Sequence, residues 1–392
     1  MLRRACPGTG GLESYTQVLA TALSTHDSVD VVAQEIGTAG GPGHLALLLR
    51  GATFAPFADE ALRTRPVAPG LPGRALAVGI GLRKVKNRLG LHVDHDDPRL
   101  YARILGPALA RAAAGADVLH AMNGGNFASA SVAAAHRLAR PFVIAPHAHP
   151  GQWDDSPADA RAYAAADAVV ATGPADARTY LDLGVPEERV HVIPPCTAVP
   201  SRGGGAALRD QHGLTGPLVV FVGRREAYKG ADLVKAAIAE LSPRIPGLAG
   251  VLLGPGPDPA AEYEGGVLTR GMVDEEEKWG WLEAADVVCL PSSYESFGLV
   301  VAEAWSVGTP VVVSQTAALR DLVERGSGGL SVPREVRSVA EALEALLTDP
   351  ARAAELGRRG RERWLAEHTP ERCAAAHHAL YARVVDAHSA RG

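Results

Sequence analysis

The sequence is poor in cysteine and has no long apolar run. Its cysteines, Cys6, Cys196, Cys289 and Cys373, are scattered along 392 residues with no CxxC pair. This spacing argues against a disulfide framework or a cysteine-based zinc site, and it favours a reducing compartment. No stretch approaches the roughly 18 apolar residues of a transmembrane helix, and no apolar segment typical of a signal peptide follows Arg3-Arg4. We therefore expect a cytoplasmic protein.

An excess of basic residues is also missing. The 39 Lys and Arg are outnumbered by 44 Asp and Glu, which gives a formal net charge of -5. This mild negative charge argues against a dedicated nucleic-acid-binding protein. The length suggests two or three domains.

Short apolar strands alternate with longer helical patterns, which predicts α/β units around parallel sheets. Strands are expected at Val29–Ala33, Asp117–His120, Phe142–Ala145, Ala168–Ala171, Val190–Ile193, Leu218–Val222, Val251–Leu253, Val287–Leu290, Pro310–Val313 and Leu330–Val332. Two similar phrases, Ala165–Val170 and Ala284–Val288, each span the end of a helix and the start of a strand. We interpret them as a sign of two similar halves.

A proline- and glycine-rich stretch separates these halves. Pro194-Pro195 and Gly203-Gly204-Gly205 favour a linker over 196–216. The predicted organisation is a doubly wound domain over 1–195 and a second one over 217–368. Ligands of doubly wound sheets bind at the carboxyl ends of the strands, so two such domains facing each other would form a ligand-binding cleft.

The stretch after one apolar strand carries the strongest functional signal. The strand Asp286–Leu290 is broken by Pro291-Ser292-Ser293, and a helix is expected to start near Phe297-Gly298. The unpaired N–H groups of a helix start form an anion site. Glu295 and Glu303 frame this site, about 12 Å apart if most of the span is helical. Each carboxylate could accept two hydrogen bonds from a diol of a sugar or a ribose.

This Glu-x7-Glu stretch resembles the signature of glycosyltransferase family 4, the retaining enzymes with the GT-B fold. The alternative is two solvated glutamates on an ordinary helix, but Ser296–Leu299 and Gly308–Val313 also resemble the family. The resemblance implies an α/β protein with two Rossmann-like domains facing across a cleft. It also implies that Glu295 orients the hydroxyls of the donor sugar and that Glu303 binds the ribose.

A basic loop follows a second strand. Phe221–Gly230 is similar to the family's G-R…K-G segment, and the resemblance assigns Arg224 and Lys229 to the donor diphosphate. Arg offers a planar fork to phosphate oxygens and Lys a mobile point charge. Arg225 is an ambiguous neighbour, and a solvated basic loop is the alternative. If these cations supply the positive charge, the reaction needs no metal.

Two motifs of the first half also resemble the family. Gly11 lies in a glycine-rich turn that the resemblance places beside the donor phosphate and the acceptor, although a structural turn is the alternative. His147 follows a strand, and the resemblance places it against the donor sugar. His147 matches that position better than His149. A His-x-His metal site and a purely structural histidine are the alternatives.

The remaining donor contacts are implied by the resemblance alone. They come from loops such as Gly254–Asp258 that hold the base and ribose through backbone atoms, so uracil and guanine are not distinguished. The donor-binding residues expected on this basis are Arg270, Met272, Phe297, Gly298 and Leu299, together with those named above. A last helix, which begins at the cap-and-proline pair Thr369-Pro370, is expected over 370–388, packed back on the first domain.

Two further charged runs favour other interpretations. Asp94-His95-Asp96 has the Asp-x-Asp pattern of metal-dependent transferases, but no strand precedes it, and we interpret it as a solvated turn. Arg83–Arg88 is the densest basic run. A solvated helix face or an acceptor loop is favoured over contact with an anionic membrane.

The expected function is transfer of a sugar from a UDP- or GDP-sugar to a small-molecule acceptor, such as a natural product or thiol precursor. Anomeric configuration would be retained, the attack would be front-face, and no metal or other cofactor would be needed. The expected partners are the nucleotide sugar and the acceptor, and the oligomeric state is left open. The alternatives are an epimerase or phosphorylase of the same fold, a lipid-acceptor glycosyltransferase, and a non-catalytic binding scaffold.

Overall fold

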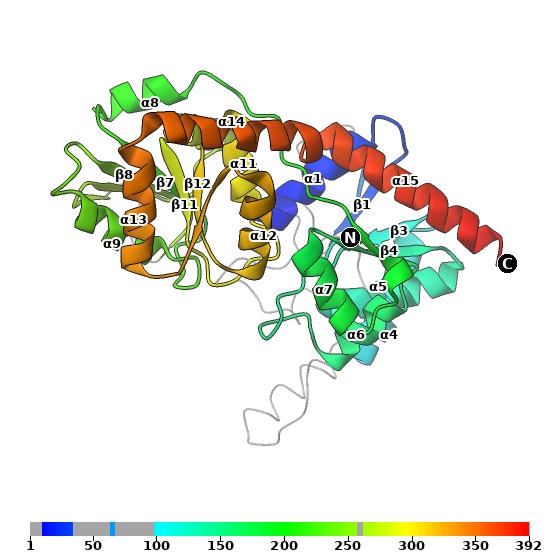
Figure 1. The fold of residues 1–392 in the computed structure, drawn as a ribbon. Helices are drawn as coiled ribbons and strands as arrows, with labels where there is room; N and C mark the ends of the chain where they lie inside the picture. The colour runs from blue at the N-terminus through cyan, green and yellow to red at the C-terminus, as the bar shows by residue number, and fades with distance from the viewer. Residues whose placement is uncertain (1–9, 34–62, 67–97, 257–261, 392) are drawn as a thin grey trace, which may run out of the picture. The chain divides into compact units, whose positions relative to one another are not determined.

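The computed structural model describes residues 10–33, 63–66, 98–256 and 262–391. Two compact units are present (Figure 1). Among the described residues, the first comprises 10–193 and 374–391, and the second comprises 194–373. Asp94-His95-Asp96 and Arg83–Arg88 lie outside the described residues.

The first unit is built on a parallel sheet of order β3-β4-β5-β6. Its strands are β3 (Leu119–Ala121), β4 (Phe142–Ile144), β5 (Ala168–Ala171) and β6 (Val190–Val192). Its helices are α4 (Pro98–Ala112), α5 (Gly125–Leu138), α6 (Pro157–Ala164) and α7 (Pro174–Asp182), with a 3-10 turn at Glu187–Arg189. Every residue of the central strands β4 and β5 is buried. Burial on both faces explains why these strands appear in the sequence as continuous apolar runs.

A second parallel pair in this unit joins β1 (Asp30–Ala33) to β2 (Arg63–Pro66). Helix α1 (Gly11–Leu23) precedes it and buries Tyr15, Leu19 and Leu23. Spaced four residues apart, these three side chains lie on one face of the helix. The strand β2, which contains two arginines and a proline, has no apolar pattern and was not predicted.

The second unit is built on a seven-stranded sheet of order β13-β12-β11-β7-β8-β10-β9. Its strands are β7 (Leu218–Val222), β8 (Ala249–Leu253), β9 (Glu262–Glu264), β10 (Val267–Arg270), β11 (Val287–Leu290), β12 (Val311–Ser314) and β13 (Gly329–Val332). All neighbouring strands run parallel except β9, which is antiparallel to β10. The five strands predicted here are therefore present within two residues of their expected bounds, whereas β9 and β10 were not predicted as strands.

Helices pack around this sheet. They are α8 (Gly205–Gln211), α9 (Ala231–Leu241), α10 (Glu275–Ala284), α11 (Leu299–Val307), α12 (Ala317–Gly326), α13 (Val336–Leu347) and α14 (Pro350–Glu367). Helix α9 contacts α13, helix α10 contacts α8 and α11, and α14 contacts α11, α12 and α13. The stretch 196–216, expected as a linker, belongs to the second unit and contains α8, whose Arg209 donates to the carbonyl oxygen of Ala284.

The last helix, α15 (Pro370–Ser389), extends beyond its predicted bounds. Its residues from Ala374 onward belong to the first unit. There, Tyr381 lies 2.7 Å from His120 and Arg391 lies 2.6 Å from Asp167. No helix in the described part of the chain combines the length and hydropathy that crossing a bilayer requires.

Trp305 is packed between two glycines in the core of the second unit. Its indole is fully buried and donates to the carbonyl oxygen of Gly328 at 2.9 Å. A Cβ at Gly360, in α14, would lie 2.3 Å from the indole Cδ1. The close approach of α14 to α11 therefore requires glycine at this position.

Replacing Gly360 with alanine should lower the free energy of unfolding of the second unit by about 1–3 kcal/mol, because the methyl group overpacks the indole. Urea unfolding followed by tryptophan fluorescence measures this. Helix propensity alone favours alanine over glycine by ~1 kcal/mol. The variant Ala354→Gly, at an exposed position of the same helix, measures this contribution without the contact with the indole. A Gly360→Ala variant as stable as the parent would contradict the packing argument.

Candidate functional site

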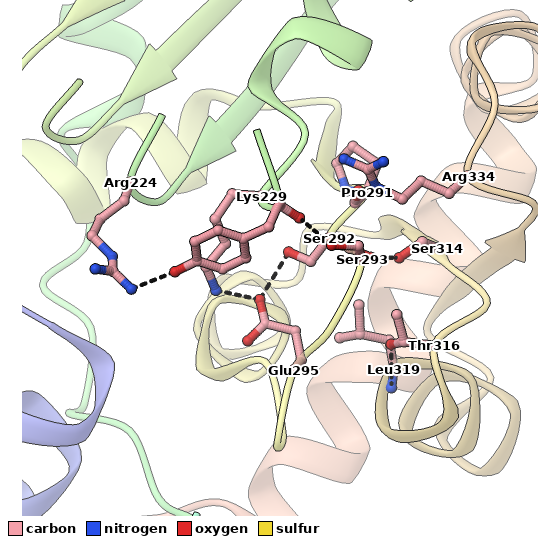
Figure 2. Close-up of polar contacts among 11 residues, drawn as sticks. Arg224, Lys229, Pro291, Ser292, Ser293, Glu295, Ser314, Thr316, Leu319 and Arg334 are labelled. Carbon is pink, nitrogen blue, oxygen red and sulfur yellow. Dashed lines mark hydrogen bonds and ion pairs between the residues drawn. The ribbon is translucent and has the colours of Figure 1, made fainter. Parts of the chain in front are cut away.

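Three loops meet at the carboxyl edge of the second sheet, because β7, β11 and β12 are neighbours and run in parallel (Figure 2). The loop after β11 is tied to the loop after β7 by a hydrogen bond of 2.7 Å from Ser293 N to the carbonyl oxygen of Tyr228. Arg334 donates to the carbonyl oxygens of both Pro291 (2.8 Å) and Ala227 (2.6 Å). Arg334, which the sequence analysis missed, therefore fixes the spacing of the two loops.

The centre of this site is a contact between Lys229 and Glu295. Lys229 Nζ lies 2.5 Å from Glu295 Oε1, and the two side chains are 18% and 11% exposed. The hydroxyl of Ser292 donates to the same oxygen at 2.9 Å. Among the described residues, none donates to Oε2 of Glu295. One oxygen of the carboxylate is thus held in place, and the other is available as an acceptor.

A second lysine–glutamate pair joins helix α10, which carries Lys278, to helix α11, which carries Glu303. Glu303 is buried one turn inside the helix, and its Oε1 lies 2.8 Å from Lys278 Nζ. Lys278 also contacts the exposed Glu275 at 2.9 Å. Burial by itself lowers the pKa of Lys278, but the carboxylates of Glu303 and Glu275 raise it above its usual value. The sequence analysis identified Glu303 but not Lys278.

Arg224 lies beside the first pair, but its polar contacts are with Tyr228 and Glu226 (Figure 2). Its guanidinium donates to the hydroxyl of Tyr228 and lies 3.4 Å from Glu226. The Tyr228 ring is stacked on Tyr294, with centroids 4.7 Å apart and planes 3° from parallel. Arg224 is half exposed, so its side chain is accessible from solvent.

Arg225, the ambiguous neighbour, has a different environment. It is buried, and its Nε donates to the carbonyl oxygen of Gly254 at 3.1 Å. Gly254 has a φ of +124°, and a Cβ there would lie 2.2 Å from the carbonyl oxygen of Gly223. The hydrogen bond of Arg225 therefore ties the loop after β7 to the loop after β8.

The nucleotide-binding candidates after β10 are in separate environments. Arg270 forms a 2.9 Å ion pair with Glu277, whose carboxylate also accepts from Trp281. Met272 is an exposed apolar residue. The carbonyl oxygen of Gly271 accepts from Gly254 N at 3.0 Å, which ties this loop to the loop after β8.

The helix start lies where the sequence predicts it. Helix α11 begins at Leu299, and its N-cap is Gly298 with φ +91°. No side chain caps this end. Phe297 is buried, and its ring centroid lies 5.4 Å from that of His368. Gly298 is required here because its backbone is in the left-handed region.

The remaining candidates, Gly11 and His147, belong to the first unit. Gly11 is the first residue of α1. His147 follows β4 with φ +54°, and its ring lies edge-on to that of Tyr15, 5.9 Å between centroids. Its Nε2 is buried without a hydrogen-bond partner in the described part of the chain. The backbone conformation and the buried nitrogen distinguish this residue from an ordinary structural histidine.

Among the described residues, no group of three or more His, Cys, Asp or Glu side chains could hold a metal ion. His149, the second histidine of the His-x-His pattern, contacts the carbonyl oxygen of His147 at 2.9 Å and the ring of Trp153.

The imidazole of His147 should remain neutral at pH 5. Desolvation, followed by the charge of His149, lowers its pKa to about 4. An unfolded histidine titrates near ~6.5, so the stability that neutral His147 contributes is complete above that pH and is lost as pH falls towards 4. NMR of the imidazole nitrogens from pH 8 to 4 measures the titration, and a midpoint above 6 would show that the ring is not desolvated.

Comparisons with known proteins agree with this architecture. The family described as "Glycosyl transferase 4-like domain" matches residues 10–196, and "Glycosyl transferases group 1" matches residues 207–363. A D-inositol 3-phosphate glycosyltransferase of Xylanimonas cellulosilytica is 36% identical over 216 residues, 49% of this chain and 51% of the relative. An alpha-D-kanosaminyltransferase of Streptomyces kanamyceticus is 31% identical over 182 residues, 42% of this chain and 47% of the relative. The chain spans about half the length of these curated relatives.

Solved structures share the fold over nearly the whole chain. Anabaena Alr3699/HepE in complex with UDP has a TM-score of 0.72 at 18% identity, covering 97% of this chain and 98% of that one. A sucrose-phosphate synthase from Thermosynechococcus elongatus has a TM-score of 0.70 at 23% identity, covering 96% and 94%. Two units with parallel sheets and these likenesses define a protein with the GT-B fold. The chain belongs to the group 1 glycosyltransferases, and its N-terminal half is a glycosyltransferase 4-like domain.

Proposed function

We propose that this protein is a retaining, metal-independent glycosyltransferase that transfers a sugar from a UDP- or GDP-sugar to a hydroxyl group of a small polar acceptor. The observation that carries the proposal is the contact of Lys229 with Glu295 at the carboxyl edge of the second sheet, with Lys229 five residues along the loop from the accessible Arg224. A cation for the diphosphate and an acceptor for sugar hydroxyls are thereby placed side by side.

The pair can serve donor phosphate and donor sugar at once. An ammonium group has three N–H donors, and the contact with Glu295 uses one of them. The others can bind phosphate oxygens, while Oε2 of Glu295 accepts from sugar hydroxyls. A hydrogen bond to a charged group contributes roughly 1.5–3 kcal/mol net. Because the ion pair holds both side chains, little reorganisation is needed when the donor binds.

The proposed reaction breaks the bond between the anomeric carbon and the diphosphate oxygen, and its electron pair leaves with the diphosphate. Lys229 and Arg224 stabilise the negative charge that develops there, so their interactions strengthen in the transition state. The acceptor oxygen bonds to the anomeric carbon on the same face. Its proton passes to the departing phosphate, so the protein supplies no nucleophile and no general base.

The names of the relatives guide the choice of substrates. Solved structures of the same fold contain UDP, UDP with glucose, and UDP-glucose, which supports a uridine nucleotide as the first donor to test. Relatives named for inositol 3-phosphate and for kanosamine transfer support a small polyol or aminoglycoside-like acceptor. An epimerase would convert the donor without an acceptor, and a lipid-acceptor enzyme would need a membrane-embedded substrate. Product analysis separates these alternatives.

A nucleotide panel tests donor binding. In the presence of a chelator, UDP or GDP at 100 times its dissociation constant should stabilise the protein by about 2.7 kcal/mol, which a thermal-shift assay detects. Lys229→Met should lose most of this stabilisation. Lys235→Met, in helix α9 of the same unit, is the matched control and should retain it. Stabilisation only in the presence of divalent metal would contradict the metal-independent proposal.

Glu295→Ala should lower kcat by a factor on the order of 10²–10³, because the donor sugar loses its acceptor and Lys229 loses its partner. Circular dichroism should show an unchanged fold. Glu226→Gln, which alters the exposed acidic neighbour of Arg224, is the control and should retain most activity. Near-normal turnover by Glu295→Ala would refute the role of Glu295, and an inverted product would refute the retaining mechanism.

A further inference from the structure

Lys278 is an almost buried lysine, 12% exposed, whose ammonium faces a buried carboxylate. Lysine is rarely buried unless it is paired, and only five lysines occur in the chain. Helix α10 carries Lys278 and helix α11 carries Glu303, and these two helices contact each other. The side chain therefore has a defined place in the packing between the two helices.

The contact uses one oxygen of Glu303. Lys278 Nζ lies 2.8 Å from Oε1, and none of the described residues donates to Oε2. The same arrangement occurs at Glu295, where Lys229 and Ser292 both contact Oε1. In each case a lysine compensates a poorly solvated carboxylate and restricts its orientation, while one oxygen keeps its full capacity to accept.

Lys278 also contacts Glu275, so the charge of its ammonium could be balanced without Glu303. The carboxylate of Glu275 is 56% exposed and is solvated without help, whereas that of Glu303 is 11% exposed. Without the ammonium of Lys278, the carboxylate of Glu303 would lose the side-chain contact that fixes its orientation. It would then be held less firmly for a diol.

We propose that Lys278 is a positioning residue that keeps the carboxylate of Glu303 oriented toward the ribose diol of the donor nucleotide, so that it sets the preference for a ribonucleotide over a 2′-deoxyribonucleotide. This inference rests on the proposed function and on the binding of ribose by Glu303 that the resemblance to glycosyltransferase family 4 implies. A site built to hydrogen-bond a hydroxyl discriminates against a ligand that lacks it, because a buried polar group is left unpaired. By holding the carboxylate of Glu303 in place, Lys278 makes Glu303 part of a site that is built to hydrogen-bond a hydroxyl.

The rival interpretation is that Lys278 only joins α10 to α11. A joining residue would contribute to stability, and its loss would weaken both nucleotides equally. A positioning residue contributes to the difference between them. The ratio of the dissociation constants for the deoxyribonucleotide and the ribonucleotide therefore separates the two interpretations.

The experiment measures binding of UDP and 2′-deoxy-UDP, and of GDP and 2′-deoxy-GDP, to the full chain by calorimetry. The parent should bind the ribonucleotide about ten- to a hundredfold more tightly. Lys278→Met should reduce this ratio toward one, chiefly by weakening the ribonucleotide, and Glu303→Gln should do the same. The double variant should be no less selective than Glu303→Gln alone. Glu275→Gln, which leaves the contact of Lys278 with Glu303 in place, is the matched control and should keep the parental ratio.

Two results would overturn different claims. If Lys278→Met keeps the parental ratio while Glu303→Gln loses it, Lys278 only joins the helices and the inference is wrong. If the parent itself shows no preference and Glu303→Gln binds like the parent, Glu303 does not bind ribose and the role that the resemblance implies for it is wrong. Should Lys278→Met not fold, Lys278→Gln and Lys278→Arg replace it, with selectivity lost in the first and largely kept in the second.

Discussion

The ion pair between Lys229 and Glu295 is the interaction on which the site depends. Each group is mostly withdrawn from water, and a withdrawn charge is costly unless it is paired and hydrogen-bonded. Ser292 supplies the additional hydrogen bond to the carboxylate. The pair can form because β7 and β11 are adjacent parallel strands, so that the loops following them leave the same edge of the sheet. Arg334 joins these loops through their carbonyl oxygens and holds the two charges in register.

The second pair, Lys278 with Glu303, repeats this arrangement between helices α10 and α11. In both pairs a lysine contacts one carboxylate oxygen, and the other oxygen can accept from a ligand. Such a site is organised before its ligand arrives, which lowers the reorganisation that binding requires. The two glutamates lie on either side of the uncapped start of α11 in the sequence, with Gly298 as N-cap. A phosphate near this helix start would meet N–H groups and the positive end of the helix dipole.

The strands and the helix start could be predicted from the sequence because they depend on local patterns. Buried parallel strands such as β5, β7 and β11 are apolar throughout, and Gly298 marks the start of α11. The prediction failed where the local pattern was weak. Strand β9 is a short edge strand with two glutamates, and α8 begins within a glycine run that was interpreted as part of a linker.

The sequence by itself determined the α/β class, the order of the main strands and the residue types at the site. Glu295, Glu303, Arg224 and Lys229 stand out because glutamates and basic residues follow apolar strands at recognisable spacings. Only the tertiary structure decided their partners. Lys229 and Glu295 are separated by 66 residues and Lys278 and Glu303 by 25, and a contact over such a distance in the chain depends on strand order and helix packing. No local sequence pattern encodes strand order or helix packing, so the roles of Lys278 and Arg334 could be recognised only in the tertiary structure.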